Sequence, residues 1–484
     1  MRRPLPLALL LPLLLAAPAT AQEQDWRTEA DALRRRLDEQ AAELEALRRW
    51  LDAATAFVDT RVVAPPEGHP PLAVAFDGEL VELTAKLGRY TLTLHPRAGV
   101  QTDLRAYPAG DARPDDNFLV RRARVGLDGT LGDFAFVVQV QVQRSPTQLV
   151  DAWVQWQRYD ALRLRFGHFK TPFSLDNGPT GGDFTTDFIE RPMVIGSGRT
   201  LAPDFHLGAE ALGTLLDGHV RYWLSAQNQP DSSQVRSSDL MYAARLELLY
   251  GPVSVGGGGV WEWHPDVEPG FPGVTPGQFE FFQPVSVAGL WQRWEVDLTV
   301  YTGPVFARCE LAYAEQERRG VLAGGRDGTP LCTQGGELTL GWMVGGKRAG
   351  ARPSTRAIQP DSGRAIEPLD GWSWLSWDVL KRRDRRQAGL ELLARVEWMR
   401  LDDRRGGGRL ASGQRAREAT GATATNVAGA ECTAVSLGIN FNPIEDVRFS
   451  VNWVHLWFSD RLRAERAADD RQSDELLLRA QLDF

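Results

Sequence analysis

The chain has little of several features that define common protein classes. It has three cysteines in 484 residues, Cys309, Cys332 and Cys432, which excludes a small disulfide-stapled scaffold. A bridge between Cys309 and Cys332 stays open, since an oxidising compartment permits it. Its four lysines are too few to line a path for anions. The net charge of −8 argues against a nucleic-acid partner.

Long apolar runs are also missing once the first residues are passed, so we expect no transmembrane helix. At the N-terminus, two arginines, an apolar run over residues 5–17 and the site Ala19-Thr20-Ala21 form the pattern of a signal peptide, residues 1–21. A membrane anchor is the alternative, but the run is short and is interrupted by Pro6 and Pro12. We expect the mature chain to lie outside the cytoplasm.

Residues 22–63 lack glycine and proline and carry leucines at heptad positions. This pattern predicts a coiled coil of about four heptads. A single amphipathic helix packed on the rest of the protein is the alternative reading. A Pro-rich linker over residues 65–71 follows. The heptad leucines are Leu33, Leu37, Leu44, Leu47 and Leu51.

From about residue 72 the apolar period changes from helical to two. Side chains alternate between the two faces of a strand, so each such segment has one apolar and one polar face. The pattern continues to the last residue, Phe484, and an aromatic-ended strand resembles the assembly signal of bacterial outer-membrane barrels. Clear examples are residues 134–142, 162–166, 390–398, 447–453 and 476–484.

Alternating strands after a signal peptide predict a transmembrane antiparallel β-barrel, with lipid outside and polar groups inside. Unequal connections fit this, because residues 442–446 are short while 345–370 and 404–430 are long. Strands of about 10 residues give roughly 14 to 18 strands. Tryptophans near strand ends predict aromatic girdles. They are Trp153, Trp156, Trp291, Trp294, Trp453 and Trp457.

An ordered set of motifs narrows the type of barrel. The chain resembles the phosphate-selective porin O and P family, whose members show an RRAR-like strand, a DAY-like strand, a G-x-F-K-x-P-F-S-L segment and an F-x-E-R segment in this order. The closing strands near Glu391–Arg395 and Leu437–Pro443 are also similar. The corresponding segments here are Phe118–Leu127, Asp151–Val154, Gly167–Leu175 and Phe188–Arg191.

The resemblance implies an all-β, 16-stranded barrel in the outer membrane of a Gram-negative cell, spanning residues 64–484 with the linker at its start. It also implies a homotrimer and a loop folded into each pore, which by position includes residues 170–204. We expect the coiled coil, residues 22–63, to lie in the periplasm as an N-terminal helix.

Arginines on the polar strand faces are the candidate pore-lining and anion-binding residues, because a guanidinium donates two parallel hydrogen bonds to phosphate. If Leu119, Ala123 and Val125 face lipid, Arg122 and Arg124 face the lumen. The alternative is that inward acids neutralise these arginines, and residues 170–210, which include the loop, have three bases against six acids. The candidate residues are Arg122, Arg124, Arg163, Arg165, Lys170 and Arg191.

These observations favour a porin for passive diffusion of small hydrophilic solutes, with anions such as phosphate expected from the resemblance. The alternative is a non-conducting envelope anchor with a plugged barrel and a coiled-coil tether. The seven histidines lie in no recognisable nucleophile motif, so we expect no enzyme. We expect no cofactor and no metal, and as partners outer-membrane lipid, small anions and other copies of the chain.

Removing Phe484 tests the terminal signal. We expect the truncated chain to assemble poorly, because the last strand would lose its aromatic end. The heat-modifiable band of folded barrel in gel electrophoresis measures the yield. Equal yields from the truncated and full chains would contradict this prediction.

Overall fold

A computed structural model gives the fold of the barrel portion of the chain. The predicted signal peptide, the coiled coil and most of the linker lie outside the described residues, as does Phe484. The structure describes residues 72–76, 81–87, 90–107, 117–143, 147–176, 184, 186–196, 201–229, 240–282, 284–302, 304–322, 324–345, 389–403, 430–444, 447–459 and 472–483.

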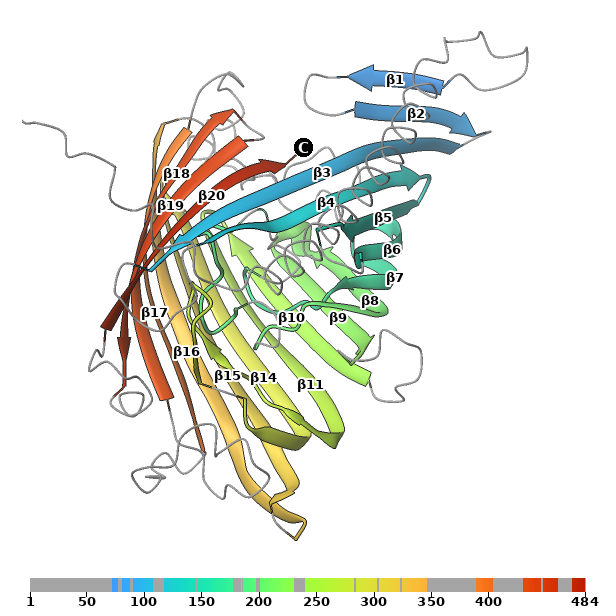
Figure 1. Ribbon diagram of the computed structural model, residues 1–484. Coiled ribbons are helices and arrows are strands. Elements are labelled where there is room, and N and C mark those ends of the chain that lie inside the picture. Colours follow the sequence, from blue (N-terminus) through green and yellow to red (C-terminus); the bar gives the residue numbers. More distant parts are fainter. Residues whose placement is uncertain are drawn as a thin grey trace, which may run out of the picture. The chain divides into compact units, whose positions relative to one another are not determined.

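The described residues are almost entirely β-strand (Figure 1). The large sheet contains β1 (Leu72–Phe76), β2 (Val81–Leu87), β3 (Tyr90–Ala106), β4 (Asn117–Leu131), β5 (Phe134–Gln141), β6 (Gln148–Tyr159), β7 (Leu162–Lys170), β8 (Phe205–Leu215), β9 (Val220–Asn228), β10 (Leu240–Tyr250), β11 (Val253–Pro269), β14 (Ser286–Thr302), β15 (Val305–Leu322), β16 (Arg326–Gly345), β17 (Gly389–Asp403), β18 (Ala430–Ile444), β19 (Val447–Phe458) and β20 (Gln472–Asp483). A separate small sheet holds β12 (Gly273–Val274) and β13 (Glu280–Phe282), and a 3-10 turn η1 (Leu216–Gly218) links β8 to β9.

The large sheet closes on itself. Each strand from β3 to β20 pairs antiparallel with its neighbour in the chain, apart from the separate β12 and β13, and β20 also pairs with β3. The strands β3–β11 and β14–β20 therefore form a closed ring of 16 strands. The predicted 16-stranded antiparallel barrel is confirmed.

The two faces of the barrel wall differ as the period-two pattern predicts. On β18, Ser436 and Asn440 are fully buried and face the interior, whereas Leu437 and Ile439 are 50% and 47% exposed on the outside. The same alternation holds along β5, β7, β17 and β19. The apolar outer face suits a lipid surrounding, and the inner face carries the polar groups.

Exposed aromatic side chains lie on the outer face near both ends of the strands, as girdles require. Trp294, Trp453 and Trp457 are among them, as predicted. The prediction was wrong for Trp153 and Trp291, which are 5% and 6% exposed and face the interior, where both pack in clusters of buried apolar side chains. Further outer aromatics are Tyr90, Phe118, Tyr159, Tyr250, Tyr301, Tyr313, Trp342 and Trp398.

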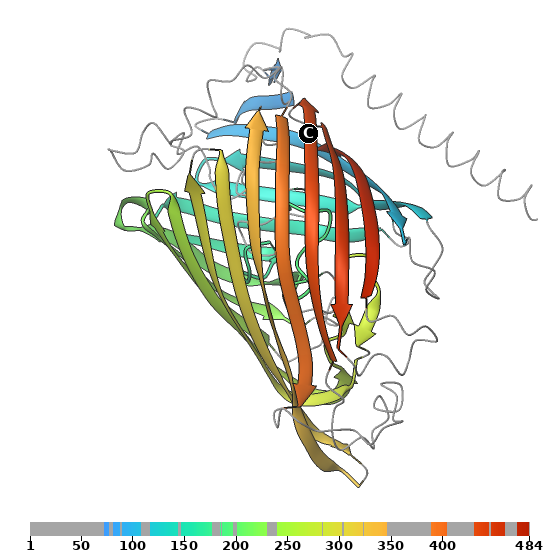
Figure 2. The same cartoon turned by 90° about the vertical axis from the view of Figure 1, so that its left-hand side faces the viewer.

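Most connections at one end of the barrel are shorter than those at the other. Two-residue connections follow β4, β6, β10, β14 and β18, all at one end of the barrel, which we call the short-turn end. The hairpin of β15 and β16, whose strands have 18 and 20 residues, projects at the opposite, long-loop end (Figure 2). One prediction needs correction: residues 346–388 follow β16, so this long connection starts at the short-turn end.

β1 and β2 fill a step at the barrel seam. β20 pairs with β3 from Ala106 to Gly99, and β2 pairs with the same edge of β3 from Leu94 to Tyr90. Strands of a closed barrel tilt and stagger, so the last strand meets the first part-way along its length. Figure 1 shows β1 and β2 beside the first half of β3, away from β18 and β19.

Cys309 and Cys332 lie on the neighbouring strands β15 and β16 but form no bridge. Cys309 is opposite Leu338, and Cys332 is opposite Glu315. The two cysteines are therefore six positions apart along the ladder, about 20 Å at the usual rise of a strand. Within the described part of the chain, no helix is long and apolar enough to cross a membrane.

Candidate functional site

All six candidate residues belong to two strands and one connection. Arg122 and Arg124 lie on β4, Arg163 and Arg165 on β7, and Lys170 ends β7. The four strand arginines are 4–8% exposed and face the interior. Arg191 lies in the connection between β7 and β8, residues 171–204, and is 5% exposed. Lys170 is half-buried.

A β-bulge on β4 changes which side chains face inward. Gln101 of β3 is opposite Arg122 and Thr102 is opposite Val120, so Arg121 is an extra residue on β4. Arg121 reaches the barrel interior beside Arg122 and contacts the 171–204 connection. Beyond the bulge the alternation is reversed, and Leu119 lies opposite the fully buried Asp103. The prediction that Leu119 faces lipid was therefore wrong, because a bulge shifts the register by one residue.

Glutamine amides hold several of the interior arginines. Arg122 donates to Oε1 of Gln101 at 3.0 Å, and Arg124 donates to Oε1 of Gln141 at 3.1 Å. An amide oxygen fixes the position of a guanidinium without cancelling its charge. The other two arginines also have carboxylate partners. Arg165 donates to Gln155 at 2.9 Å and pairs with Glu210 at 2.9 Å, and Arg163 pairs with Asp160 at 2.6 Å.

Charge is segregated between two parts of the inner wall. The strands β19, β20 and β3–β8, which are neighbours in the ring, hold seven buried arginines, Arg105, Arg122, Arg124, Arg163, Arg165, Arg448 and Arg479, against four buried acids, Asp103, Asp128, Glu210 and Glu475. The strands β10, β11 and β14–β17 hold five, Arg245, Arg293, Arg308, Arg318 and Arg395, against ten acids, Glu247, Glu262, Glu295, Asp297, Glu310, Glu337, Glu391, Glu397, Asp402 and Asp403. We call these the basic wall and the acidic wall.

On the acidic wall, Arg245, Arg293, Arg308 and Arg395 are paired with carboxylates. Arg245 lies 2.7 Å from Asp297, and Arg395 lies 2.9 Å from Glu397. The alternative reading, in which inward acids neutralise inward arginines, therefore describes much of this side, and it also applies to Arg165 with Glu210 and to Arg479 with Asp103 on the basic wall.

The 171–204 connection folds into the barrel, where arginines of the strands bind its Glu190. Two nitrogens of Arg121 donate to the Glu190 carboxylate at 2.9 and 3.1 Å, and Arg105 donates at 2.5 Å. Arg479 lies 3.7 Å from the same carboxylate, and Arg395 donates to the Glu190 carbonyl at 3.1 Å. Burial would raise the pKa of Glu190, but these arginines hold it well below its ordinary value. Four strands thus hold one glutamate.

Further acids of this connection also pair with the wall. Asp176 and Asp187 each lie 2.5 Å from a guanidinium nitrogen of Arg308 on β15. Together with Glu190, they direct their charge to wall arginines. The excess of acids in this connection therefore acts to attach it to the strands.

Apolar packing fixes the same connection at the long-loop half of the barrel. Phe173, Ile195 and Leu201 are fully buried and belong to one apolar cluster with inward side chains of the strands. A second connection, residues 270–285 between β11 and β14, contributes buried side chains to the same cluster. Sequence reasoning missed it, although four phenylalanines in a segment rich in glycine and proline were a usable signal.

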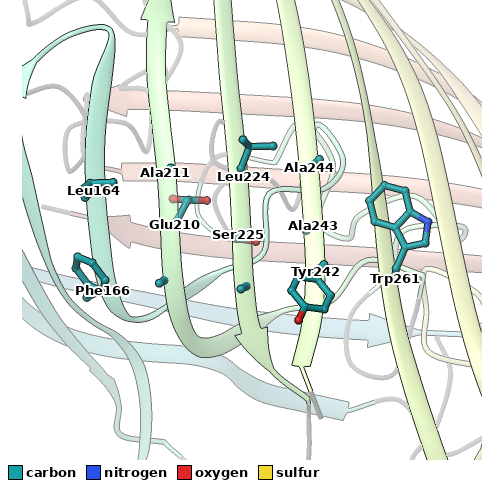
Figure 3. A pocket seen from close by; sticks show the side chains of 12 residues that line it. Leu164, Phe166, Glu210, Ala211, Leu224, Ser225, Tyr242, Ala243, Ala244 and Trp261 are labelled. Atoms are coloured by element: carbon teal, nitrogen blue, oxygen red, sulfur yellow. The ribbon is translucent and has the colours of Figure 1, made fainter. Parts of the chain in front are cut away.

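A depression of about 500 Å³ lies on the outer face of β7–β11 (Figure 3). Ala211 and Ala244 lie among the large outward side chains of Leu224, Tyr242 and Trp261. Tyr242 and Leu224 are each 54% exposed, which marks this as the outer face. The depression is therefore separate from the barrel interior. In the part of the chain that the structure describes, no group of three or more His, Cys, Asp and Glu side chains could hold a metal ion.

Comparison with known proteins agrees with this geometry. The family model of phosphate-selective porin O and P matches residues 96–263. The fold is similar to OmpT, an outer membrane protein of Vibrio cholerae, at 10% identity over 81% of this chain and 98% of that chain, with a TM-score of 0.50. An anion-selective porin from Comamonas acidovorans matches at 13% identity over 81% of this chain and all of that chain, with a TM-score of 0.46. No curated protein matches the sequence.

The closed barrel and the family match together define an outer-membrane porin. Over residues 96–263 the chain is similar to the phosphate-selective porin O and P family. The likeness to OmpT, at 10% identity, reflects the shared fold alone.

Replacing Glu190 with glutamine tests how strongly the strand arginines hold the 171–204 connection. Removing one partner from a buried cluster leaves the guanidinium charges without it, so we expect the folded barrel to lose about 3–5 kcal/mol of stability. Denaturant unfolding of the barrel in detergent measures this loss. Asp133→Asn is the control, since its pair with Arg158 is exposed and 3.7 Å long, and we expect less than about 1 kcal/mol there. Equal stability of both variants would contradict a stabilising role of Glu190.

Proposed function

We propose that the protein lets small hydrophilic anions, phosphate among them, diffuse passively through the barrel. The observation that carries this proposal is the position of Arg124, Arg163 and Arg165 relative to the 171–204 connection. In its described part, that connection binds strands from β15 around to β4. β7 lies beyond β4 in the ring, so these hydrogen bonds do not extend to Arg163 and Arg165, which are buried against the wall itself.

Cations of two strands, β4 and β7, meet at one aromatic ring. Arg124 Cζ lies 5.8 Å and Lys170 Nζ 5.2 Å from the centre of the Phe205 ring at the start of β8. Arg124 also lies 5.7 Å from the ring of Phe184, which belongs to the connection. Two cations held beside a narrowing segment favour anions, since charge acts strongly where bulk water is scarce.

Arginine suits phosphate and carboxylate solutes because its planar fork matches two oxygens at once. With four lysines in the whole chain, arginines supply most of the positive charge of the basic wall. The acidic wall opposite sets up a field across the interior, which would draw anions toward β4 and β7. The family match and the fold point to a channel and not to an enzyme.

A plugged barrel that anchors the envelope remains the second candidate. The apolar cluster that joins the 171–204 and 270–285 connections to the inner wall favours it, because this packing narrows the long-loop half. Single-channel current in a planar bilayer separates the two functions. A barrel that passes no ions under any condition tested would contradict the porin proposal.

We also propose a homotrimer, with residues 22–63 as a parallel coiled coil in the periplasm below the barrel. Support comes from the leucine heptads and from one similar structure, that of OmpT of Vibrio cholerae in a trimer form. Mass measurement of the protein in detergent should give three chains per particle. A mass of one chain would contradict the trimer.

Reversing the charge at both Arg122 and Arg124 tests whether they contribute to anion selectivity. The double variant Arg122→Glu, Arg124→Glu puts two acids in place of two bases inside the barrel, so we expect ion preference to shift strongly toward cations. The reversal potential in a salt gradient measures this preference. Arg158→Glu is the control, since its side chain is 61% exposed at the short-turn end. A folded double variant with unchanged selectivity would contradict the proposal.

A further inference from the structure

The 270–285 connection crosses the barrel interior. It starts after Pro269 of β11 and ends at Ser286 of β14, and its small sheet brings β12 beside β17 and β13 beside β18. Its tip, residues 275–278, reaches β20, which is separated from β14 in the ring by β15–β19. The segment therefore spans the long-loop end from one side to the other.

A buried glutamate clasps the tip. The carboxylate of Glu475 on β20 accepts a hydrogen bond from Thr275 Oγ1 at 2.7 Å and another from the Gly277 amide at 2.6 Å. Tyr107, just after β3, donates its hydroxyl to the Gly277 carbonyl at 2.6 Å. Glu475 is fully buried. Glu475 of β20 and Tyr107 after β3 thus bind the tip of a segment that starts at β11 and ends at β14.

The tip is shaped to fit the clasp. A Cβ at Gly277 would lie 2.5 Å from the carboxyl carbon of Glu475, so a larger residue would displace the carboxylate. The Thr275 hydroxyl also accepts a hydrogen bond from the Phe279 amide at 3.0 Å, which closes the turn on itself. The turn therefore has the shape and the hydrogen-bond donors that the carboxylate of Glu475 requires.

The underside of the segment is apolar. Phe271, Phe281 and Phe282 are 2–3% exposed and belong to the cluster that also contains the 171–204 connection. The ring of Phe281 lies 6.2 Å from that of Phe458 on β19, and the ring of Phe279 lies 5.8 Å from it. A layer of buried apolar side chains offers ions no polar partners, so it is a barrier to them while the segment stays in place.

The base of the segment is anchored in the sheet. Gly270 donates to the Val285 carbonyl at 2.8 Å, and the Phe271 amide donates to Gln316 Oε1 at 3.0 Å. The two ends thus stay joined to β11 and β14, and movement of the segment would have to break the polar contacts at the tip and the apolar packing of Phe281 and Phe282.

We propose that residues 270–285 form a lid that closes the long-loop mouth, and that Glu475 is the positioning residue that holds it shut. The inference rests on the proposed porin function, since a lid matters where solutes pass. Releasing the tip would open a route from the long-loop end to the basic wall. The lid thus sets the conductance of the barrel, and the arginines set its ion preference.

Single-channel recordings of clasp variants test the lid. Glu475→Ala removes the acceptor, and Gly277→Ala keeps Glu475 but leaves no space for the turn. We expect both to raise conductance, or the fraction of time spent open, several-fold over wild type. Glu317→Ala is the matched control, because its carboxylate also accepts a backbone amide, that of Leu290 at 2.8 Å, without touching the lid. We expect it to behave as wild type.

A third variant separates the lid from the porin proposal. Here residues 272–283 are replaced by a short glycine-serine linker, and heat-modifiability confirms that each variant is folded. If the wild type, both clasp variants and the linker variant conduct alike, the lid inference is overturned and the porin proposal stands. If none of them conducts, the porin proposal fails. Hydrogen exchange of the Gly277 and Phe279 amides is a second measurement, and fast exchange in the wild type would overturn the closed lid.

Discussion

The rest of the structure depends on the pairing of β20 with β3. In a lipid environment no backbone amide or carbonyl can be left without a partner, so a sheet that crosses the membrane must close. The eight pairs from Ala106 opposite Leu476 to Gly99 opposite Asp483 provide that closure. Closure separates an inside from an outside, and only then can one face of each strand hold buried arginines while the other meets lipid.

The interior that closure creates is organised by charge. The basic wall and the acidic wall lie on different strands, and the 171–204 connection is attached by its own acids to arginines of both. Glu190 satisfies guanidiniums of β3, β4 and β20, and Asp176 and Asp187 satisfy Arg308. The same carboxylates therefore fix the position of the connection inside the barrel, and their contacts do not extend to the arginines of β7.

Local sequence was sufficient for the strands but not for their irregularities. Alternation over residues 390–398 and 447–453 correctly separated the two faces, because one period-two pattern serves a whole regular strand. The same reasoning gave the wrong face for Leu119, since a one-residue bulge at Arg121 depends on its pairing with β3. Trp153 and Trp291 were placed in the girdles by their position near strand ends, but their inward faces follow from register.

The long connections were the hardest part to predict. Segment 170–204 was expected inside the barrel from the family resemblance, and the structure has its described residues there. The 270–285 connection was not expected, because its partners Glu475 and Tyr107 are about 170 to 200 residues away and no local pattern links them. Residues 345–370 were taken for one of the long loops on the side opposite the short turns, but the direction of β16 starts this connection at the short-turn end.

The pairing of β2 with β3 has a mechanical consequence for the seam. β2 occupies the edge of β3 from Leu94 to Tyr90, directly in line with the end of β20 at Gly99. A strand that slid along this edge toward Tyr90 would collide with β2 before its apolar residues found a new match. A slip of one residue would also turn every side chain of β20 to the wrong face. Because the hairpin of β1 and β2 stops β20 from sliding along β3, a segment outside the ring of 16 strands sets the circumference of the barrel.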